Sequence, residues 1–340
     1  MKPRGPLRFR STNDGEEGNS HAGLWIAMGL LLLTLIAAGV LTVVLLSKKD
    51  EGGKTPDSAA SGAVAQPAAS SAVTQPAASS AGGPAGTLAI AGGKTVTYTA
   101  QQIAGWNGAC GGKCVVDGDV LSVTMQPGLP YPANGGMKQH LQVSGRVTEV
   151  LTEFELKFGE AGKPFDFVKG GKATIGFEMG EGLARSGHWT AGAASARCMW
   201  RREGGASLYV YYGKSDGSQT SINSLADQDP EYARHAHSTG TAGHSLWEHR
   251  KSEDPLPFFK PGVWHRVQIY GRMNSPAKFD GAVGMSVDGS TRLYSKMRWM
   301  DKPSTVTDVT AVAFFGGSDS SWNPPVAETI SFRNVRVTTK

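Results

Sequence analysis

The sequence predicts an all-β domain, a jelly-roll β-sandwich, preceded by one transmembrane helix and a disordered linker. Three observations predict this organisation. After residue 88, short runs of alternating apolar and polar residues recur between Gly, Asn, Asp and Pro. Near the N-terminus, one apolar stretch is long enough to span a membrane, and an Ala/Ser/Pro-rich segment follows it. No other long segment keeps a helical period.

The apolar stretch is residues 22–46, which carry no charged side chain. As a helix it would be about 37 Å long, which exceeds the ~30 Å hydrocarbon core of a bilayer. A cleavable signal peptide is the alternative, but its apolar region would be shorter and would end at a small-residue cleavage site. Basic residues in 1–21 favour a cytoplasmic tail. We therefore expect a single-pass cell-membrane protein with an extracytoplasmic C-terminal domain, or a protein secreted after cleavage.

Residues 47–87 have few large apolar side chains and repeat the hexamer Gln-Pro-Ala-Ala-Ser-Ser. Such a composition cannot offset the entropy of ordering, so we expect a flexible tether. Residues 88–340 are enough for one substantial core, and we expect this domain to be monomeric. The chain has a formal net charge of +5 and no basic run interleaved with aromatic residues, which argues against nucleic-acid binding.

Five segments of the domain show the clearest strand pattern. They are Val120–Met125, Val150–Phe158, Trp264–Tyr270, Gly284–Gly289 and Ile330–Val337. Many short strands in one domain of this size are typical of a jelly roll. The concave face of such a sheet forms a natural groove for a chain-like ligand.

The three cysteines indicate one disulfide and one core thiol. Cys110 and Cys114 are close enough in sequence to form a disulfide outside the cytosol. A zinc pair is the alternative, but no second cysteine pair follows. Cys198 alternates with apolar residues, which predicts a buried thiol and not a nucleophile.

Residues 222–258 form a long polar segment that carries His235, His237, His244 and His249. A long polar segment in a compact domain is usually functional or mobile, and we expect a surface flap over the groove. Metal binding is the alternative, because His-Ala-His has the alternation of a metal-binding strand. No Asp or Glu follows at a diagnostic spacing, so we expect neither a metal nor another cofactor.

Residues 193–212 read as two strands around a Glu-Gly-Gly turn. Alternation places Ser195 and Arg197 on one face, with Tyr209 and Tyr211 on the same face of the neighbouring strand. A cation, a hydroxyl and two phenols on one face suit an acidic sugar and proton transfer on it. An ordinary solvated strand face is the alternative.

A turn centred on Gly204 would place Arg197 opposite Tyr211, and Met199 opposite Tyr209. Cross-strand neighbours have Cβ atoms about 5 Å apart, so Arg197 and Tyr211 would share one ligand.

Six sequence blocks in order carry a resemblance to a known family. They are Phe167-Val-Lys-Gly-Gly-Lys172, Ser195-Ala-Arg-Cys-Met-Trp-Arg201, Tyr209-Val-Tyr211, Asn274 to Asp280-Gly281, Val287-Asp-Gly289, and Phe314-Phe-Gly-Gly317 followed by Trp322 and Phe332-Arg-Asn334. In this order, residues about 165 to 337 resemble polysaccharide lyase family 14, whose members cleave alginate or glucuronan. The resemblance implies a concanavalin-like jelly roll that cleaves polyuronates by β-elimination.

The resemblance implies a catalytic set of Lys172, Ser195, Arg197, Tyr209 and Tyr211. A polyuronate lyase removes the proton at C5 beside a carboxylate, so negative charge builds on a group that is already negative. Arg197 and Lys172 would neutralise that charge, with Ser195 as a further donor. Adjacent cations lower the pKa of a phenol, so a tyrosine can move the proton. We expect Tyr211 to carry it, with Tyr209 in support.

His188, Arg201 and Asn274 are the expected substrate-binding residues, and His188 is the alternative base. This chain departs from the family pattern after Lys172, where Ala173-Thr-Ile-Gly176 replaces Leu-Pro-Gly, and at Ala194, which replaces a tryptophan. Both changes bear on the lining of the groove and on substrate choice.

Two other classes of function stay open. A membrane-tethered module would bind acidic glycan without cutting it. A hydrolase would need paired carboxylates across the groove, and Glu178 and Glu181 are the acids nearest to the Lys172 block.

Overall fold

The computed structural model describes residues 87–340, apart from 111–113, 129–132, 134, 168, 181–183, 186–187, 190–192, 213–227, 239–242, 302 and 317–319. The expected tail, the anchor at 22–46 and nearly all of the linker lie outside the described residues. Within the described ranges, no helix is long and apolar enough to cross a membrane. The anchor therefore stays a prediction.

Strands dominate the described residues, with a few single-turn helices between them. The strands are β1 (Lys94–Tyr98), β2 (Asn107–Cys110), β3 (Cys114–Asp117), β4 (Val120–Met125), β5 (Met137–Val147), β6 (Glu149–Phe158), β7 (Gly171–Met179), β8 (Ala184–Arg185), β9 (His188–Trp189), β10 (Ala194–Trp200), β11 (Ala206–Tyr212), β12 (Ala236–Ser238), β13 (His244–Leu246), β14 (Trp264–Arg272), β15 (Gly281–Val287), β16 (Ser290–Met297), β17 (Val306–Phe315) and β18 (Glu328–Thr339). The helices are α2 (Ala100–Ala104), η1 (Arg202–Gly204), α3 (Tyr232–His235) and η3 (Ser320–Trp322).

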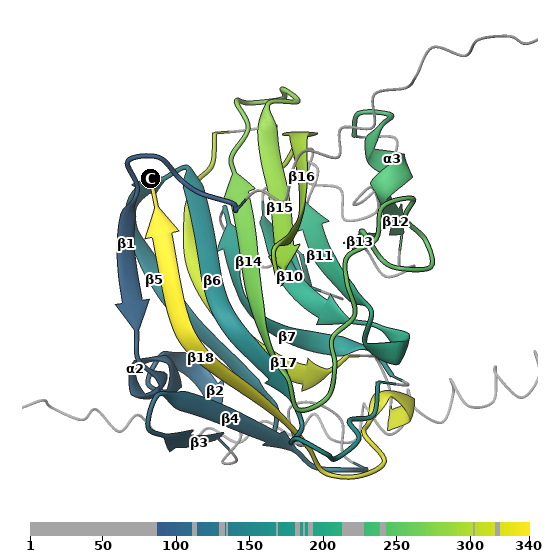
Figure 1. The fold of residues 1–340 in the computed structure, drawn as a ribbon. Coiled ribbons are helices and arrows are strands. Elements are labelled where there is room, and N and C mark those ends of the chain that lie inside the picture. Colours follow the sequence, from purple (N-terminus) through teal and green to yellow (C-terminus); the bar gives the residue numbers. More distant parts are fainter. Residues whose placement is uncertain are drawn as a thin grey trace, which may run out of the picture. The chain divides into compact units, whose positions relative to one another are not determined.

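The strands form two eight-stranded antiparallel sheets that lie as front and back layers in Figure 1. Sheet 1 has the order β16-β15-β14-β6-β18-β4-β3, with β1 also paired to β18. Sheet 2 has the order β12-β13-β11-β10-β7-β17-β5-β2. This confirms the predicted all-β sandwich, and the arrangement is consistent with a jelly roll. Each of the five expected strand segments lies largely within a strand of sheet 1.

The core lies between the sheets because every second residue of each strand faces inward. An aromatic cluster at one end surrounds Phe158, whose ring centroid is 5.0–5.4 Å from those of Phe165, Phe167, Trp200 and Phe259. The Trp200 indole donates to the carbonyl of Lys169 at 2.9 Å. A Cβ at Gly171 would collide with the Trp200 ring. The glycine thus lets β7 pass close to that ring, and the next residue, Lys172, points to the opposite face.

The cysteines behave as the sequence indicates. A disulfide joins Cys110, at the end of β2 in sheet 2, to Cys114, at the start of β3 in sheet 1. It therefore ties edge strands of the two sheets together. Cys198 is free and buried in the core, and burial raises the pKa of its thiol.

The described part of residues 222–258 differs from the expected flap. β12 and β13 pair with each other, and β13 pairs with β11, so this segment widens sheet 2. The buried His244 ring lies 3.0 Å from the Tyr212 hydroxyl and 3.3 Å from that of Tyr232. The polar composition reflects hydrogen bonds inside this extension.

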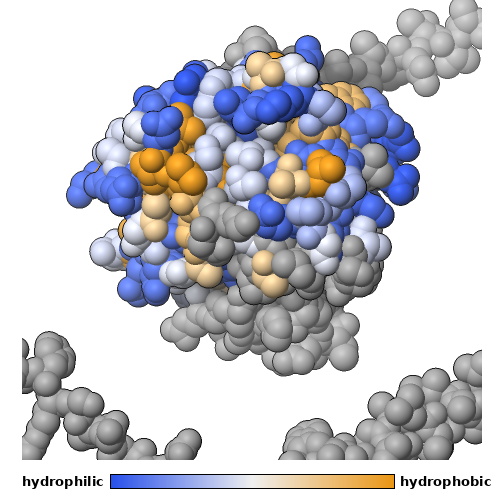
Figure 2. All heavy atoms as spheres, turned by 90° about the horizontal axis from the view of Figure 1, so that it is seen from below, coloured by the Kyte–Doolittle hydropathy of each residue, from blue (hydrophilic) through white to orange (hydrophobic). Residues whose placement is uncertain are grey.

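The surface of the domain is mostly polar on the side shown in Figure 2, where apolar residues form small separate areas. Exposed large apolar side chains are scattered over several elements and include Val115, Leu293 and Val326. Such isolated residues are normal on protein surfaces.

Candidate active site

The candidate site lies on the outer face of sheet 2, where β7, β10 and β11 are neighbours. On β10, Ala196, Cys198 and Trp200 belong to the core between the sheets, so Ser195 and Arg197 face outward. Tyr209 and Tyr211 belong to a separate cluster on the same outer face. The predicted common face of the hairpin is therefore present.

The register within the hairpin differs from the prediction by two residues. Ser195 lies opposite Tyr211, and Arg197 lies opposite Tyr209. The turn is centred on Glu203, which adopts a left-handed backbone conformation with φ 62°. Glycine is the residue that usually adopts a positive φ, which is why the turn was expected to be centred on Gly204, and this prediction was wrong.

A β-bulge shapes the contact between β10 and β7. Ala196 pairs with Phe177 and Met199 pairs with Lys172, so β7 has two more residues than β10 over this stretch. The backbone N–H of Cys198 donates to the Thr174 hydroxyl at 3.1 Å. The bulge brings the strands so close that a Cβ at residue 176 would collide with the carbonyl oxygen of Ala196. The bulge therefore requires a residue without a side chain at position 176, which Gly176 provides.

Arg197 is at the centre of a buried polar group. Its guanidinium donates to the Ser195 hydroxyl at 2.8 Å and forms an ion pair with Glu178 of β7. Arg197 is only 3% exposed. The Nδ1 of His140, on β5, lies 4.0 Å from the Glu178 carboxylate. Burial lowers the pKa of His140, and the Glu178 charge opposes that shift.

The two tyrosines form one hydrogen-bonded pair. The Tyr211 hydroxyl donates to the Tyr209 hydroxyl at 3.1 Å, and the rings meet edge to face with centroids 4.9 Å apart. Two cations lie over the Tyr209 ring, with Lys172 Nζ at 5.3 Å and the Arg201 guanidinium at 5.6 Å from its centroid. Tyr209 thus connects the phenol pair to the positive charges of the site.

Lys172 is the cation most altered by its surroundings. Its ammonium lies between the rings of Tyr209 and Phe314, 5.0 Å from the Phe314 centroid. Burial, together with the charges of Arg197, Arg201 and Lys138, lowers the pKa of Lys172 to about 7. Such a perturbed group in a polar cluster is typical of functional sites.

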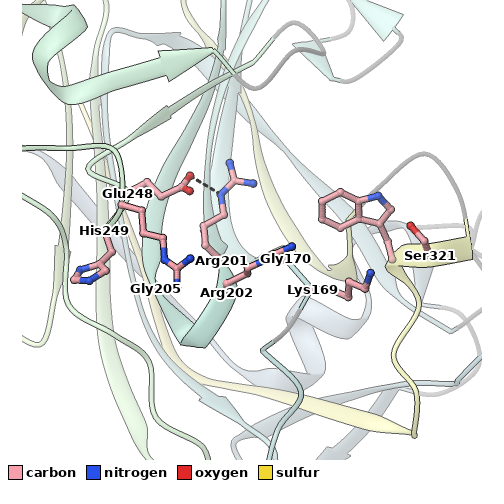
Figure 3. A pocket seen from close by; sticks show the side chains of 10 residues that line it. Lys169, Gly170, Arg201, Arg202, Gly205, Glu248, His249 and Ser321 are labelled. Atoms are coloured by element: carbon pink, nitrogen blue, oxygen red, sulfur yellow. Dashed lines mark ion pairs between the residues drawn. The ribbon is translucent and has the colours of Figure 1, made fainter. Parts of the chain in front are cut away.

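Arg201 continues the same face at the turn end of β10, where it lines a pocket of about 290 Å³ (Figure 3). Its Nε lies 3.0 Å from a carboxylate oxygen of Glu248. Lys169 and Trp322 line the same pocket. Arg201 was predicted to bind substrate, and the structure places it beside both the pocket and Tyr209.

Of the other two expected substrate-binding residues, His188 stays a prediction, and Asn274 is not brought into this cluster. His188 lies on β9, in the small β8–β9 hairpin, and its side chain falls outside the described part of the structure. The Asn274 amide donates to the carbonyls of Ser275 and Met300 and accepts from the backbone N–H groups of Trp299 and Met300. Asn274 thus holds two backbone segments together.

Sequence reasoning missed two ionisable residues of this face, His140 and Glu248, and considered Glu178 only as a possible hydrolase acid. Glu178 is an even number of residues from Lys172 on one strand, so alternation would have placed both on one face. His140 and Glu248 are distant in the sequence, and only the pairing of sheet 2 brings them near. In the described part of the chain, no three His, Cys, Asp or Glu side chains gather as metal ligands.

Fold and face together define a β-sandwich protein in which one sheet carries clustered cations beside a pair of phenols. The family model of polysaccharide lyase 14 matches residues 117–335, and the chain belongs to this family. No curated protein sequence matches the chain.

Solved structures of alginate lyases share the fold. Alginate lyase vAL-1 from Chlorella virus is 22% identical with a TM-score of 0.55, covering 72% of this chain and 99% of that one. The marine PL-14 alginate lyase from Aplysia kurodai is 22% identical with a TM-score of 0.53, covering 67% and 88%. A double mutant of alginate lyase Aly36B, in complex with an alginate trisaccharide, is 20% identical with a TM-score of 0.53, covering 73% and 94%. At these identities the likeness shows the fold.

Proposed function

We propose that this protein is a polysaccharide lyase that cleaves a polyuronate, alginate or glucuronan, by β-elimination. One observation carries the proposal: Lys172 and Arg197 share a sheet face with a hydrogen-bonded pair of tyrosines. Membership of polysaccharide lyase family 14 supports the reaction type. The alginate lyases of similar fold make alginate the first substrate to test.

The reaction sets the demands on the site. A base takes the proton from C5, and the electron pair left on C5 forms the C4–C5 double bond. The C4–O bond breaks, and the leaving oxygen takes a proton from an acid. Because C5 carries a carboxylate, negative charge spreads onto that group in the transition state. Fixed positive charges and hydrogen-bond donors that face it lower the barrier.

Lys172 is the cation that we assign to the substrate carboxylate. Its pKa is lowered to about 7, so both the charged and the neutral amine are accessible to the free protein near neutral pH. A bound carboxylate favours the charged form and so raises the pKa of Lys172. The charge of Arg197 is already balanced by Glu178, so Arg197 positions the Ser195 hydroxyl and adds to the local field.

Proton transfer falls to the tyrosine pair. The Tyr211 hydroxyl donates to Tyr209, so the two hydroxyls act as one unit through which a proton can pass. We assign Tyr211 as the group that carries the proton and Tyr209 as its partner. Positioned acid–base groups contribute about 10²- to 10⁴-fold to a rate.

Incubation of the full-length protein with polymannuronate, polyguluronate and glucuronan tests this function. The unsaturated product absorbs in the ultraviolet, so absorbance should rise with at least one substrate. Tyr211→Phe should remove the signal without changing the melting temperature. Measurable binding of these polymers without any absorbance would reject the lyase and leave an acidic-glycan-binding module.

We also propose that residues 22–46 hold the domain at the cell membrane, on the extracytoplasmic side. The length of the apolar run and the basic tail support this. The disulfide supports an oxidising compartment. The full-length protein should stay in the membrane fraction after an alkaline carbonate wash, and protease added to intact cells should remove the domain. Release of a shortened protein into the medium would instead indicate cleavage and secretion.

A further inference from the structure

The outer face of sheet 2 extends beyond the tyrosines and Lys172. Arg201 directly follows β10 with an extended backbone, four residues or about 13 Å beyond Arg197, so alternation keeps both on one face. The pocket of about 290 Å³ opens at that point. In Figure 3 Arg201 lies between Glu248 and Lys169, which come from different segments of the chain. The pocket thus continues the candidate active site along the strand.

Positive charge exceeds negative charge around this pocket. Lys169, Arg201, Arg202 and Arg250 line it, with Glu248 as the carboxylate among the lining residues. Arg250 forms an ion pair with Glu203, and Arg201 is paired with Glu248. Even with both pairs counted, two cationic side chains are in excess, so the pocket is complementary to an anion.

Two buried nitrogens of Arg201, Nε and Nη2, make no hydrogen bond within the described residues, although Nε lies 3.0 Å from Glu248 in the ion pair. The Nη2 of Arg201 is shielded from solvent, and no hydrogen-bond acceptor among the described residues meets it. Native proteins pair nearly all buried polar groups, so each exception needs an explanation. A carboxylate that enters the pocket would supply this acceptor in a charge-assisted hydrogen bond.

The histidine-rich segment fixes the orientation of Arg201. A Glu248 carboxylate oxygen accepts from the Ser245 hydroxyl at 2.9 Å and lies 3.3 Å from the His237 ring. Burial raises the pKa of Glu248, but His237, Arg201 and Ser245 outweigh that effect and lower it to about 2. The ionised carboxylate holds Arg201 Nε on one side and leaves Nη2 for a ligand.

The pocket also offers an apolar surface for a sugar ring. The Trp322 indole lines it and packs over Gly170. A tryptophan has a broad apolar face, which suits the carbon-bound hydrogens of a pyranose. A ligand with both a ring and a carboxylate would use Trp322 and Arg201 together.

We propose that this pocket is a subsite that binds the carboxylate of a second uronate residue of the same polysaccharide chain, with Arg201 and Lys169 as its cations. The inference rests on the proposed lyase function, because the uronate bound at Lys172 for cleavage determines which neighbouring sugar of the polysaccharide would reach this pocket. Glu248 is a positioning residue, because it acts through Arg201.

Kinetics on a long polyuronate test the subsite. Arg201→Gln should raise KM at least about tenfold, the equivalent of one charge-assisted hydrogen bond. Lys169→Gln should raise KM about threefold, and it keeps the backbone carbonyl that accepts from the Trp200 indole. Both variants should change kcat less than KM. Arg266→Gln, an exposed arginine of sheet 1, is the matched control and should leave both constants unchanged.

Calorimetric binding of a uronate tetramer separates the subsite from the chemistry. It is measured in a Tyr211→Phe background, with and without Arg201→Gln or Lys169→Gln. Weaker tetramer binding in both supports the subsite, even if the wild-type protein cleaves nothing and the lyase proposal fails. An active enzyme whose KM and tetramer affinity are unchanged by both variants overturns it. Inorganic phosphate that binds the pocket and is not displaced by the tetramer also overturns it.

Discussion

The outer faces of the two sheets carry similar charged side chains in different surroundings. On sheet 1, Glu153 pairs with Arg266 and Arg336, and Glu155 pairs with Arg333, and these arginines are one-third to one-half exposed. On sheet 2, Arg197 and Glu178 pair while nearly fully buried. Both faces follow from the same alternation along the strands.

The two faces differ in how their charged side chains affect the stability of the fold. Solvent-exposed ion pairs contribute little to stability, because water screens them. Buried charges lose their hydration, and their mutual attraction barely offsets that loss. Sheet 1 therefore gains solubility from its charges, whereas sheet 2 tolerates a destabilising arrangement. Sites that combine such a cost with a perturbed lysine are where catalysis is expected.

The largest effect should come from Tyr211→Phe on sheet 2. Loss of the hydroxyl removes the proton carrier, and the rate of ultraviolet product formation should fall about 10²- to 10⁴-fold. Tyr270→Phe on sheet 1 is the matched control and should keep the wild-type rate. Equal rates for Tyr211→Phe and the wild type would move proton transfer to Tyr209 or to a histidine.

Glu178→Gln on sheet 2 should destabilise the fold more than the equivalent substitution on sheet 1. The substitution leaves the buried Arg197 charge without its counter-charge, and we expect a loss of about 3 kcal/mol in the free energy of unfolding. Denaturant titration followed by circular dichroism measures this. The same change on sheet 1, Glu155→Gln, is the reference for this comparison. A loss below 1 kcal/mol for Glu178→Gln would mean that the Arg197–Glu178 pair is as well hydrated as those of sheet 1.

Lys172→Met should stabilise the fold while it abolishes activity. A folded-state pKa of about 7, lowered from 10.5, means that the unfolded chain binds a proton more readily. At pH 7 this costs the folded protein up to about 4 kcal/mol. The wild type should gain stability as pH rises from 7 towards 10, while Lys172→Met should not show that gain. Denaturant titrations at several pH values check this, and parallel curves for the two proteins would contradict it.

The pH dependence of kcat/KM should follow the titration of the same lysine. With Lys172 as the cation for the carboxylate, kcat/KM falls as pH rises through about 7 in the free enzyme. Lys172→Arg stays charged and should lack this alkaline limb. A rise through pH 7 in the wild type would instead mean that the neutral amine acts as the base.

The smallest effect should come from Glu155→Gln on sheet 1. Its partner Arg333 is partly exposed and also stacks on the Trp264 ring at 4.2 Å, so it keeps a favourable contact. We expect a change below about 1 kcal/mol in the free energy of unfolding and no change in product formation. A larger loss would show that the outer face of sheet 1 also contributes to the stability of the fold.

Period-2 alternation was enough to predict the sandwich and the face shared by Ser195, Arg197 and the tyrosines, because it depends only on local backbone geometry. The hairpin register was not predictable, because Glu203 adopts a left-handed backbone conformation that is usually found at glycine. Glu248 could not be paired with Arg201 from sequence, because strand pairing over 47 residues of chain brings them together. Asn274 shows that a sequence block can mark a structural contact.

The bulge between β7 and β10 limits how this site can change its length. It accommodates two extra residues of β7, an even number, so Lys172 and Arg197 stay on one face. Deletion of one residue between Lys172 and Phe177 would turn the lysine towards the core or an apolar residue towards the groove. In an engineered or diverging lineage, this strand can therefore gain or lose residues only in pairs.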